Sequence, residues 1–168
     1  MTHLPGSWYV MYTRPNHEKK VAVHLNEKKI ECYLPLVKTL RQWHDRKKFV
    51  DMPIFPSYVF VYLDNWTTYH DALEDAGALY FIKTGTTMAK VEKSVIDNIK
   101  LVVGHKDNDL EVVPLMEPGQ PVVINEGPFA GFSGQMVQHQ GKRKIQVRVH
   151  LLQRSLLVSI APEYLMVV

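Results

Sequence analysis

The sequence predicts an α+β fold in two parts, an N-terminal α/β sandwich on one antiparallel sheet and a small C-terminal β-barrel. Strand-like and amphipathic helical segments alternate through residues 7–104. The stretch "GHKDNDLEVVPLMEP" that follows is acidic and aperiodic, which is typical of a linker. Beyond it, closely spaced short strands suggest a barrel. We therefore predict a first domain at residues 5–105, a linker at 106–117 and a second domain at 118–168.

The elements of the first domain follow from apolar spacing and from capping signals. Pro15 stands where the first turn of a helix tolerates proline, and Val21 and Leu25 then recur on one helical face. Asn65 or Thr67 is placed to cap a later helix. The basic stretch "RQWHDRKK" between two apolar runs predicts a two-stranded hairpin with a polar tip. The predicted strands are 8–13, 30–40, 49–55, 57–64 and 78–85, and the predicted helices are 16–29, 67–76 and 92–104.

The second domain contains strand patterns only. In "KIQVRVHL" the apolar Ile145, Val147 and Val149 alternate with polar residues, as in a strand with one wet face. The predicted strands are 120–125, 133–140, 144–152, 154–161 and 164–168.

A glycine cluster, "INEGPFAGFSGQMV", lies between the first two of these strands. Its spacing fits neither the dinucleotide fingerprint nor the P-loop, and no Lys-Ser/Thr pair follows it. No helix N-terminus follows to meet a phosphate either. We interpret the cluster as a tight corner between barrel strands.

Composition and motifs argue against an enzyme. Apolar residues make up 46% of the 168-residue chain and charged residues 22%, which is ordinary for a globular protein. Cys32 is the single cysteine, so an intrachain disulfide and a Cys-rich zinc site are excluded. The eight histidines form no HxxxH or HExxH frame, and no nucleophile elbow or kinase signature occurs. We expect no metal, no cofactor, no membrane segment and a cytoplasmic location.

The positive charge is unevenly placed. Residues 1–104 carry 14 Lys and Arg against 11 Asp and Glu, whereas residues 105–168 carry six of each sign. The whole formal excess of +3 therefore lies in the first domain. Such a surface suits a nucleic-acid contact, but a solvated basic face would look the same.

Four stretches together resemble one family. In its strand-corner-strand setting, "VVINEGPFAGFSGQMV" resembles the KOW motif of NusG-type transcription elongation factors. "SWYVMYTRPNHEKKVAVHL", "MPIFPSYVFVYL" and "ALYFIKTG" resemble, in order, parts of the NGN domain that precedes KOW in that family. The resemblance covers nearly the whole chain from Ser7. It implies a non-enzymatic adaptor, expected to be a monomer. Its NGN domain would bind the RNA polymerase clamp, and its KOW domain a small-subunit ribosomal protein or the termination factor Rho.

Two departures make the chain look more like the specialised paralogues, such as RfaH or the UpxY regulators, than like the housekeeping factor. Ser57 stands where housekeeping members tend to have glycine. The hairpin region is basic, and the Glu-rich segment typical of housekeeping members is missing before it.

The resemblance also implies the binding residues. Tyr12, Tyr58, Phe60 and Phe81 match positions that line the clamp-binding pocket. Leu152 matches the position where an exposed apolar side chain meets the ribosomal partner, and we expect a barrel that is stable without that partner. Gly127 and Gly131 match the turn of the KOW loop.

Non-template DNA is the third implied partner. Arg14 and His24 match positions that touch it in specialised relatives. The hairpin tip interleaves cations with aromatic rings, a composition used for single-strand contacts. Its candidate residues are Arg41, Trp43, Arg46, Lys47 and Lys48. The acidic "DALEDAG" lies in a region that reads DNA in some relatives, which argues against a specific recognition element.

Each of these roles has a plainer alternative on the residues alone. The strand "SYVFVYL" is apolar on both faces, so its aromatic side is either an interface or core. Leu152 is either a contact or barrel core. The chain as a whole could also be an RNA- or ribosome-binding module that does not bind polymerase.

Overall fold

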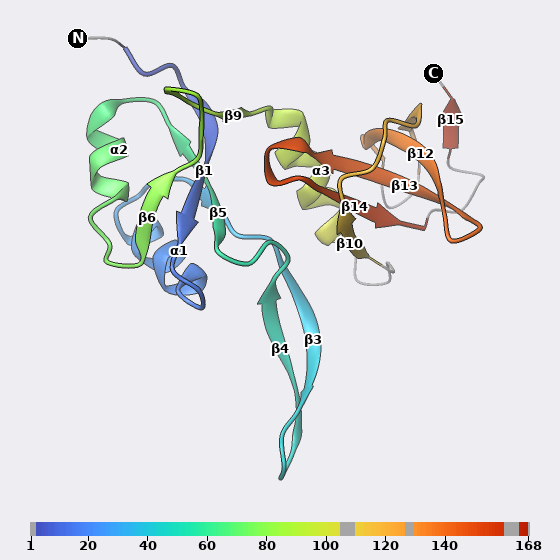
Figure 1. The fold of residues 1–168 in the computed structure, drawn as a ribbon, viewed down its shortest axis with the longest axis horizontal. Coiled ribbons are helices and arrows are strands. Elements are labelled where there is room, and N and C mark those ends of the chain that lie inside the picture. Colours follow the sequence, from blue (N-terminus) through green and yellow to red (C-terminus); the bar gives the residue numbers. More distant parts are fainter. Residues whose placement is uncertain (1–2, 105–109, 127–129, 160–164, 168) are drawn as a thin grey trace. The chain divides into compact units, whose positions relative to one another are not determined.

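The computed structural model describes residues 3–104, 110–126, 130–159 and 165–167, and shows an α+β fold with antiparallel sheets (Figure 1). This fold class is the predicted one. The chain divides into two compact units, residues 1–93 and 94–168. The predicted first domain extends further, to residue 105, and the predicted boundaries at 105 and 118 stay predictions.

The first unit is organised by a five-stranded antiparallel sheet of order β2-β5-β1-β6, with β9 also paired to β1. Its central strands, β1 and β5, are those with the most continuous apolar pattern, and most of their residues are buried. The strands are β1 (Ser7–Thr13), β2 (Cys32–Tyr33), β5 (Tyr58–Leu63), β6 (Ala78–Phe81) and β9 (Lys90–Val91). A small hairpin of β7 (Lys83–Thr84) and β8 (Thr87–Met88) precedes β9.

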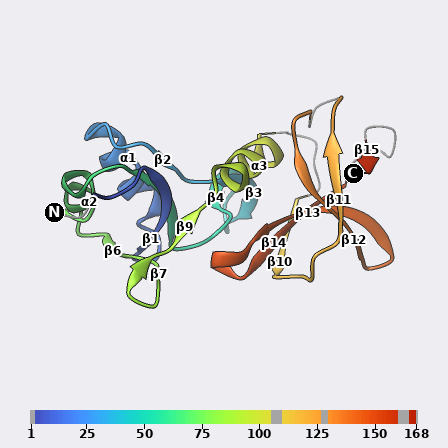
Figure 2. The same cartoon turned by 90° about the horizontal axis from the view of Figure 1, so that it is seen from above.

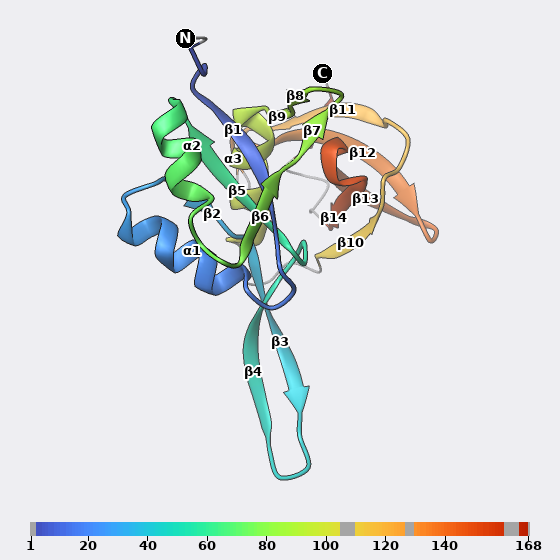
Figure 3. The same ribbon diagram turned by 60° about the vertical axis from the view of Figure 1, so that its left-hand side comes forward.

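Two helices cover one face of this sheet, α1 (Glu18–Glu27) and α2 (Trp66–Ala72), as Figure 3 shows. The predicted cap is confirmed at Asn65, whose Oδ1 accepts the Thr68 backbone N–H at 2.8 Å. Alternate residues of the strands point to the helices, because side chains in a strand alternate between faces. The buried cluster between sheet and helices includes Tyr9, Met11, Val21, Leu25, Val59, Val61, Leu63 and Phe81.

The predicted hairpin is a long two-stranded ribbon that extends away from the five-stranded sheet (Figures 1 and 3). Its strands β3 (Leu36–Gln42) and β4 (Lys47–Pro53) pair over seven residues each. The turn is closed by the Trp43 N–H, which donates to the Arg46 carbonyl at 2.8 Å. Both faces of the ribbon carry exposed side chains along most of its length.

The second unit contains helix α3 (Lys93–Val103) and a six-stranded antiparallel sheet of order β10-β14-β13-β12-β11-β15. Figure 2 shows strands β11 to β14 forming a strongly curved sheet. The predicted barrel strands correspond to β11 (Gln120–Ile124), β12 (Ser133–His139), β13 (Lys142–Val149), β14 (Arg154–Val158) and β15 (Leu165–Val167).

The predicted linker contains a strand that the sequence pattern missed. Strand β10 (Glu111–Pro114) pairs with β14, and the segment after it is also held to the sheet. The Met116 N–H donates to Ser155 Oγ at 3.1 Å, and the Met116 carbonyl accepts from Arg148 Nε at 3.0 Å. Residues 111–116 are therefore held to the six-stranded sheet.

The glycine-rich corner joins β11 to β12. Gly131 has a φ of +93°, which is the conformation that favours glycine, and its N–H donates to the Ile124 carbonyl at 2.8 Å. This geometry agrees with the predicted corner at Gly131. Gly127 lies outside the described residues. None of the helices in the described part of the chain is long and apolar enough to cross a membrane.

Candidate functional site

A row of three tyrosines crosses the sheet face that α1 and α2 leave uncovered. The register places Tyr12 opposite Tyr58 on one side and opposite Tyr80 on the other. The Tyr12 ring centroid lies 5.5 Å from that of Tyr58 and 5.2 Å from that of Tyr80. Tyr80 is 52% exposed, and the other two rings are half-buried. We call these three residues the tyrosine row.

Phe60 lies on the same face but is fully buried. Its ring is 6.2 Å from Phe55, edge to face, and 6.4 Å from Tyr33 in a stacked arrangement. Burial also raises the pKa of Tyr33 to about 12. Of the predicted polymerase-binding residues on this face, Tyr12 and Tyr58 are therefore more accessible than Phe60.

Phe81 is a correction to the predicted group. It pairs with Met11 on the helix-covered face, is 2% exposed, and its ring lies 5.4 Å from Tyr69 of α2. Adjacent residues of a strand point to opposite faces, so Phe81 and Tyr80 cannot share one. The structure does not bring Phe81 to the tyrosine row, and Tyr80 occupies that side of β6.

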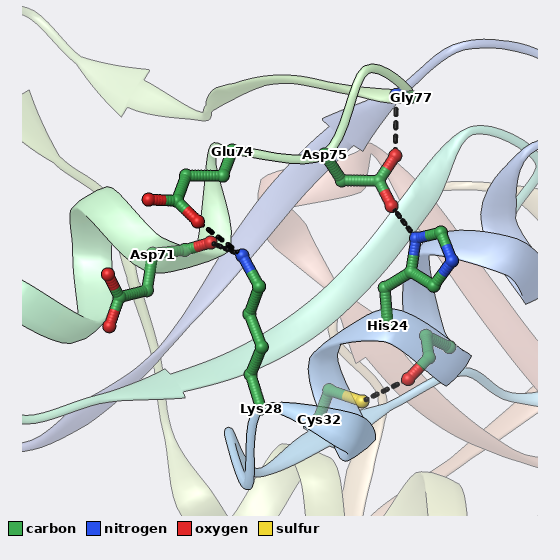
Figure 4. Close-up of polar contacts among 8 residues, drawn as sticks. His24, Lys28, Cys32, Asp71, Glu74, Asp75 and Gly77 are labelled. Carbon is green, nitrogen blue, oxygen red and sulfur yellow. Dashed lines mark hydrogen bonds and ion pairs between the residues drawn. The ribbon is translucent and has the colours of Figure 1, made fainter.

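The predicted nucleic-acid residues of the α1 region differ in how they are held. The side chain of Arg14 is exposed, while its backbone N–H donates to the Gly77 carbonyl at 2.9 Å. His24 instead contacts the Asp75 carboxylate through Nδ1 (Figure 4). The acidic segment that argued against DNA recognition thus binds one of the residues predicted to contact DNA.

A second contact, made by Lys28, joins the same two parts of the chain. Lys28 Nζ lies 2.7 Å from Glu74 Oε2 and donates to the Asp71 carbonyl at 2.9 Å (Figure 4). Together the two sets of contacts join the second half of α1 and its C-cap, Lys28, to the end of α2 and the residues that follow it. We call this set the α1 latch; its residues are His24, Lys28, Asp71, Glu74 and Asp75.

Two carboxylates of the α1 latch, those of Asp75 and Glu74, have lowered pKa values. Burial acts to raise the pKa of Asp75, but the Gly77 N–H, His24 and Lys20 outweigh it and lower the pKa. The hydrogen bond and charge of Lys28 lower the pKa of Glu74. The latch therefore brings negative charge next to the basic residues of α1.

The hairpin presents its predicted residues to solvent. Arg41, Lys47 and Lys48 are exposed, and Trp43 is 44% exposed. The Arg46 guanidinium lies over the Trp43 ring, 5.7 Å from its centroid. The structure thus places one cation of the tip, Arg46, against its aromatic residue Trp43.

Sequence reasoning overlooked two further hairpin residues. Leu40 and Phe49 are paired across the strands and are 52% and 65% exposed. In the sequence, an apolar residue at these positions looks like a core residue of a strand. The structure shows instead that both lie on the hairpin with about half or more of the side chain exposed.

Leu152 is the last predicted site residue. It lies in a short 3₁₀ helix, His150–Leu152, and is only 9% exposed. This differs from the exposed side chain that the resemblance implies, because Leu152 is among the buried apolar residues of the second unit.

Within the described ranges, no group of three His, Cys, Asp or Glu side chains is placed to hold a metal ion. The surfaces that stand out are the tyrosine row, the hairpin and the α1 latch. All three belong to the first unit.

Comparisons with known proteins assign the chain to a family. Residues 6–100 match the NusG family model, described as transcription termination factor nusG. The chain is 28% identical over 160 residues to the transcription termination/antitermination protein NusG of Pseudomonas aeruginosa, covering 88% of this chain and 90% of that protein. The NusG of Halalkalibacterium halodurans is 26% identical over 163 residues, with the same coverage.

A solved structure of Thermotoga maritima NusG, titled for its domain interaction, has a similar fold. It covers 97% of each chain with a TM-score of 0.50 and 20% sequence identity. The family model spans more than half of the sequence and includes every strand of the five-stranded sheet. The chain belongs to the NusG family of transcription termination and antitermination factors.

Proposed function

We propose that this chain is a non-enzymatic elongation or antitermination factor whose first unit binds the clamp of RNA polymerase through the tyrosine row. The exposed tyrosine row carries this proposal. Tyrosine is enriched at protein interfaces, because its ring offers apolar area and its hydroxyl a polar contact. A row of three neighbouring rings on a sheet suits an apolar helix laid across it.

Tyr80→Ala tests polymerase binding more cleanly than a change at Phe60. Phe60 is fully buried, so its truncation would cost roughly 3–5 kcal/mol of stability and confuse folding with binding. Tyr80 is 52% exposed, so its truncation removes mainly interface. The matched control is Leu79→Ala, which removes a 41% exposed apolar side chain from the neighbouring position of β6 and leaves all three rings of the tyrosine row in place.

The measurement is capture of polymerase subunits by tagged full-length protein. We expect wild type and Leu79→Ala to capture polymerase, and Tyr80→Ala to lose most of it with an unchanged melting temperature. Equal capture by Tyr80→Ala would exclude the tyrosine row. A wild-type protein that binds RNA or ribosomes but no polymerase would favour the alternative function.

Non-template DNA is the second proposed partner of the first unit. Arg14 offers an exposed guanidinium, and the hairpin offers the cations of its tip. His24 is held by Asp75, so we assign the greater share of DNA contact to Arg14 and the hairpin. Cross-linking to the non-template strand in an assembled elongation complex should fall for Arg14→Ala, whereas polymerase capture should persist.

The second unit is proposed to be a KOW domain that binds a small-subunit ribosomal protein or Rho. Support comes from its curved sheet and from the Gly131 corner. Because Leu152 is buried, Leu152→Glu could abolish binding simply by unfolding the domain, so its folding must be measured as well. A folded Leu152→Glu protein that binds both partners normally would remove Leu152 from the contact.

We further propose a specialised paralogue rather than the housekeeping factor. The basic, exposed hairpin and the serine at position 57 support this role. A factor that binds RNA polymerase acts where transcription occurs, so we propose that it works in the cytoplasm as a monomer. Deletion in the source cell should then affect a few operons, and a general effect on transcription would argue for the housekeeping role.

A further inference from the structure

The β3–β4 hairpin concentrates both the charge and the exposed apolar side chains of the first unit. Residues 36–53 contain five Lys and Arg against two Asp, a net +3 that equals the formal charge of the whole chain. Four large apolar side chains of the hairpin are exposed to solvent: Val37, Leu40, Trp43 and Phe49. Phe49, at 65%, is the most exposed of the large apolar side chains in the described residues.

The strand register separates two faces of the ribbon. Leu40 lies opposite Phe49, and the pair Gln42 and Lys47 follows on the same face. Arg41 and Lys48 lie opposite one another on the other face, because side chains alternate along a strand. Phe49 and Lys47 therefore share a face, two residues or roughly 7 Å apart along the strand.

An exposed apolar pair on the hairpin is unexpected if the hairpin binds nothing. Exposed strands are normally protected by charged side chains, and a large apolar pair works against that protection. Among the described residues, Leu40 and Phe49 are not part of the buried cluster between the five-stranded sheet and the helices. An exposed ring beside cations is instead what a nucleic-acid strand needs, since phosphates meet the charges and bases stack on the ring.

We propose that Phe49, supported across the ribbon by Leu40, is a base-stacking residue for unpaired nucleic acid, with Lys47 meeting a phosphate on the same face. Unpaired bases are required because the faces of bases inside a duplex are covered by their neighbours. This role rests on the proposed function, in which the hairpin meets a single DNA strand, and adds the residue and the form of the ligand.

An anionic membrane surface is the strongest competing occupant, since basic and apolar side chains also serve there. Membership of a transcription-factor family favours nucleic acid. The two occupants make different demands on the side chain at position 49. A membrane needs any apolar group, whereas stacking needs an aromatic ring.

The test measures binding of full-length protein to a fluorescent single-stranded oligothymidylate by anisotropy, across a series of salt concentrations. The variants are Phe49→Ala, Phe49→Leu and Phe49→Trp, with Leu79→Ala as the control for loss of an exposed apolar group. Lys47→Ala reports the ionic contribution. Circular dichroism verifies that each variant is folded, which the exposure of these side chains leads us to expect.

We expect Phe49→Ala and Phe49→Leu to bind about 5- to 100-fold more weakly, whereas Phe49→Trp and Leu79→Ala bind like wild type. Phe49→Ala should leave the slope of log affinity against log salt unchanged. Lys47→Ala should make that slope shallower by about 0.7, as one lost phosphate contact predicts.

Three results would overturn the role of Phe49. They are normal binding by Phe49→Ala, normal binding by Phe49→Leu, or a loss of equal size on a blunt duplex of the same sequence. If anionic phosphatidylserine vesicles capture the wild-type protein, and capture Phe49→Leu equally well, the hairpin would instead be a membrane-binding element. Polymerase is absent from this assay, so failure of stacking and failure of polymerase capture are separate outcomes.

Discussion

Ser57 holds a backbone conformation that side chains rarely adopt. Its φ is +70°, its N–H donates to Glu18 Oε1 at 2.8 Å, and its carbonyl accepts the Thr13 N–H at 2.8 Å. These bonds fix the turn that leads into β5. A residue with a Cβ in this left-handed conformation costs about 1–2 kcal/mol of stability, and glycine avoids that cost. This explains why glycine suits the position, as the resemblance implies for housekeeping members.

Ser57→Gly should stabilise the protein by about 1 kcal/mol, because it removes the Cβ from a left-handed position. The extra freedom of glycine in the unfolded chain offsets part of this gain. Urea unfolding measures the difference. Ser57→Ala keeps the Cβ and should give no gain, so equal stabilisation by alanine would refute the backbone explanation.

Cys32 should be a slow nucleophile in the folded protein. Burial and the neighbouring Glu31 raise the pKa of its thiol to about 11. The thiol Sγ lies 3.7 Å from the Ala22 carbonyl oxygen and 3.6 Å from Asn26 Oδ1. Roughly 0.1% of it is thiolate at pH 8, against about a quarter in an unfolded chain. Alkylation by iodoacetamide should thus be at least about 100-fold slower in native than in denatured protein. Similar rates would contradict this burial.

The placement of single residues shows where sequence reasoning stops. The alternation of β5 and its aromatic face could be predicted from "SYVFVYL" alone. The orientation of β6 could not, because Leu79 and Tyr80 are both exposed and neither residue type fixes a face. That orientation depends on pairing with β1, which contains an irregularity between Tyr12 and Thr13. The local pattern therefore does not show that Phe81 and Tyr80 lie on opposite faces of the sheet.

The α1 latch joins two elements that are far apart in sequence. The Asp75 side chain is 10% exposed and accepts the Gly77 N–H at 2.7 Å besides contacting His24. Glu74 is 66% exposed, so its pair with Lys28 is screened by water. The two carboxylates therefore form a matched pair for comparing a sheltered contact with an exposed one.

Asp75→Asn should lower the free energy of unfolding by about 1–2 kcal/mol at neutral pH. Glu74→Gln should lower it by less, because water screens the exposed carboxylate of Glu74. The pKa of Asp75 is lowered on folding, so its carboxylate stabilises above its unfolded pKa of about 4. That contribution is lost as pH falls through the folded pKa. The difference between wild type and Asp75→Asn should thus close in acid, and a difference independent of pH would refute the role of the charge.

Strand β10 shows how a short strand inside the predicted linker escapes a pattern-based prediction. Its residues, "EVVP", are too few to display a period, and the acidic surroundings resemble a solvated segment. The strand forms because β14 offers an edge and because Lys144, itself 7% exposed, lies 3.6 Å from Glu111 Oε2. Both causes come from tertiary structure, which a local pattern does not contain.

A barrel fragment of residues 110–168 should be more stable than one of residues 118–168 by about 2 kcal/mol or more. The longer fragment keeps β10 and the Met116 bonds to Ser155 and Arg148, at about 1 kcal/mol for each buried bond. Urea unfolding followed by far-UV circular dichroism measures both fragments. Equal midpoints would mean that β10 contributes nothing to the barrel.

At the scale of the whole molecule, the two binding surfaces proposed for the first unit lie on different sheets. The tyrosine row belongs to the five-stranded sheet, and the hairpin forms a sheet of its own. Changes at groups that are not in contact add in free energy to within about 0.5 kcal/mol. The factor should then hold polymerase and DNA by two independent sets of interactions.

Recruitment to an assembled elongation complex tests this independence. Tyr80→Ala should weaken recruitment by about 2 kcal/mol if the tyrosine row is an interface hot spot, and Lys47→Ala with Lys48→Ala should weaken it in a salt-dependent way. The triple variant should lose the product of the two factors, to within about twofold. A triple variant no worse than Tyr80→Ala would mean that the hairpin acts only once the clamp is bound. The two surfaces would then form one coupled site, in which DNA contact depends on prior docking to polymerase.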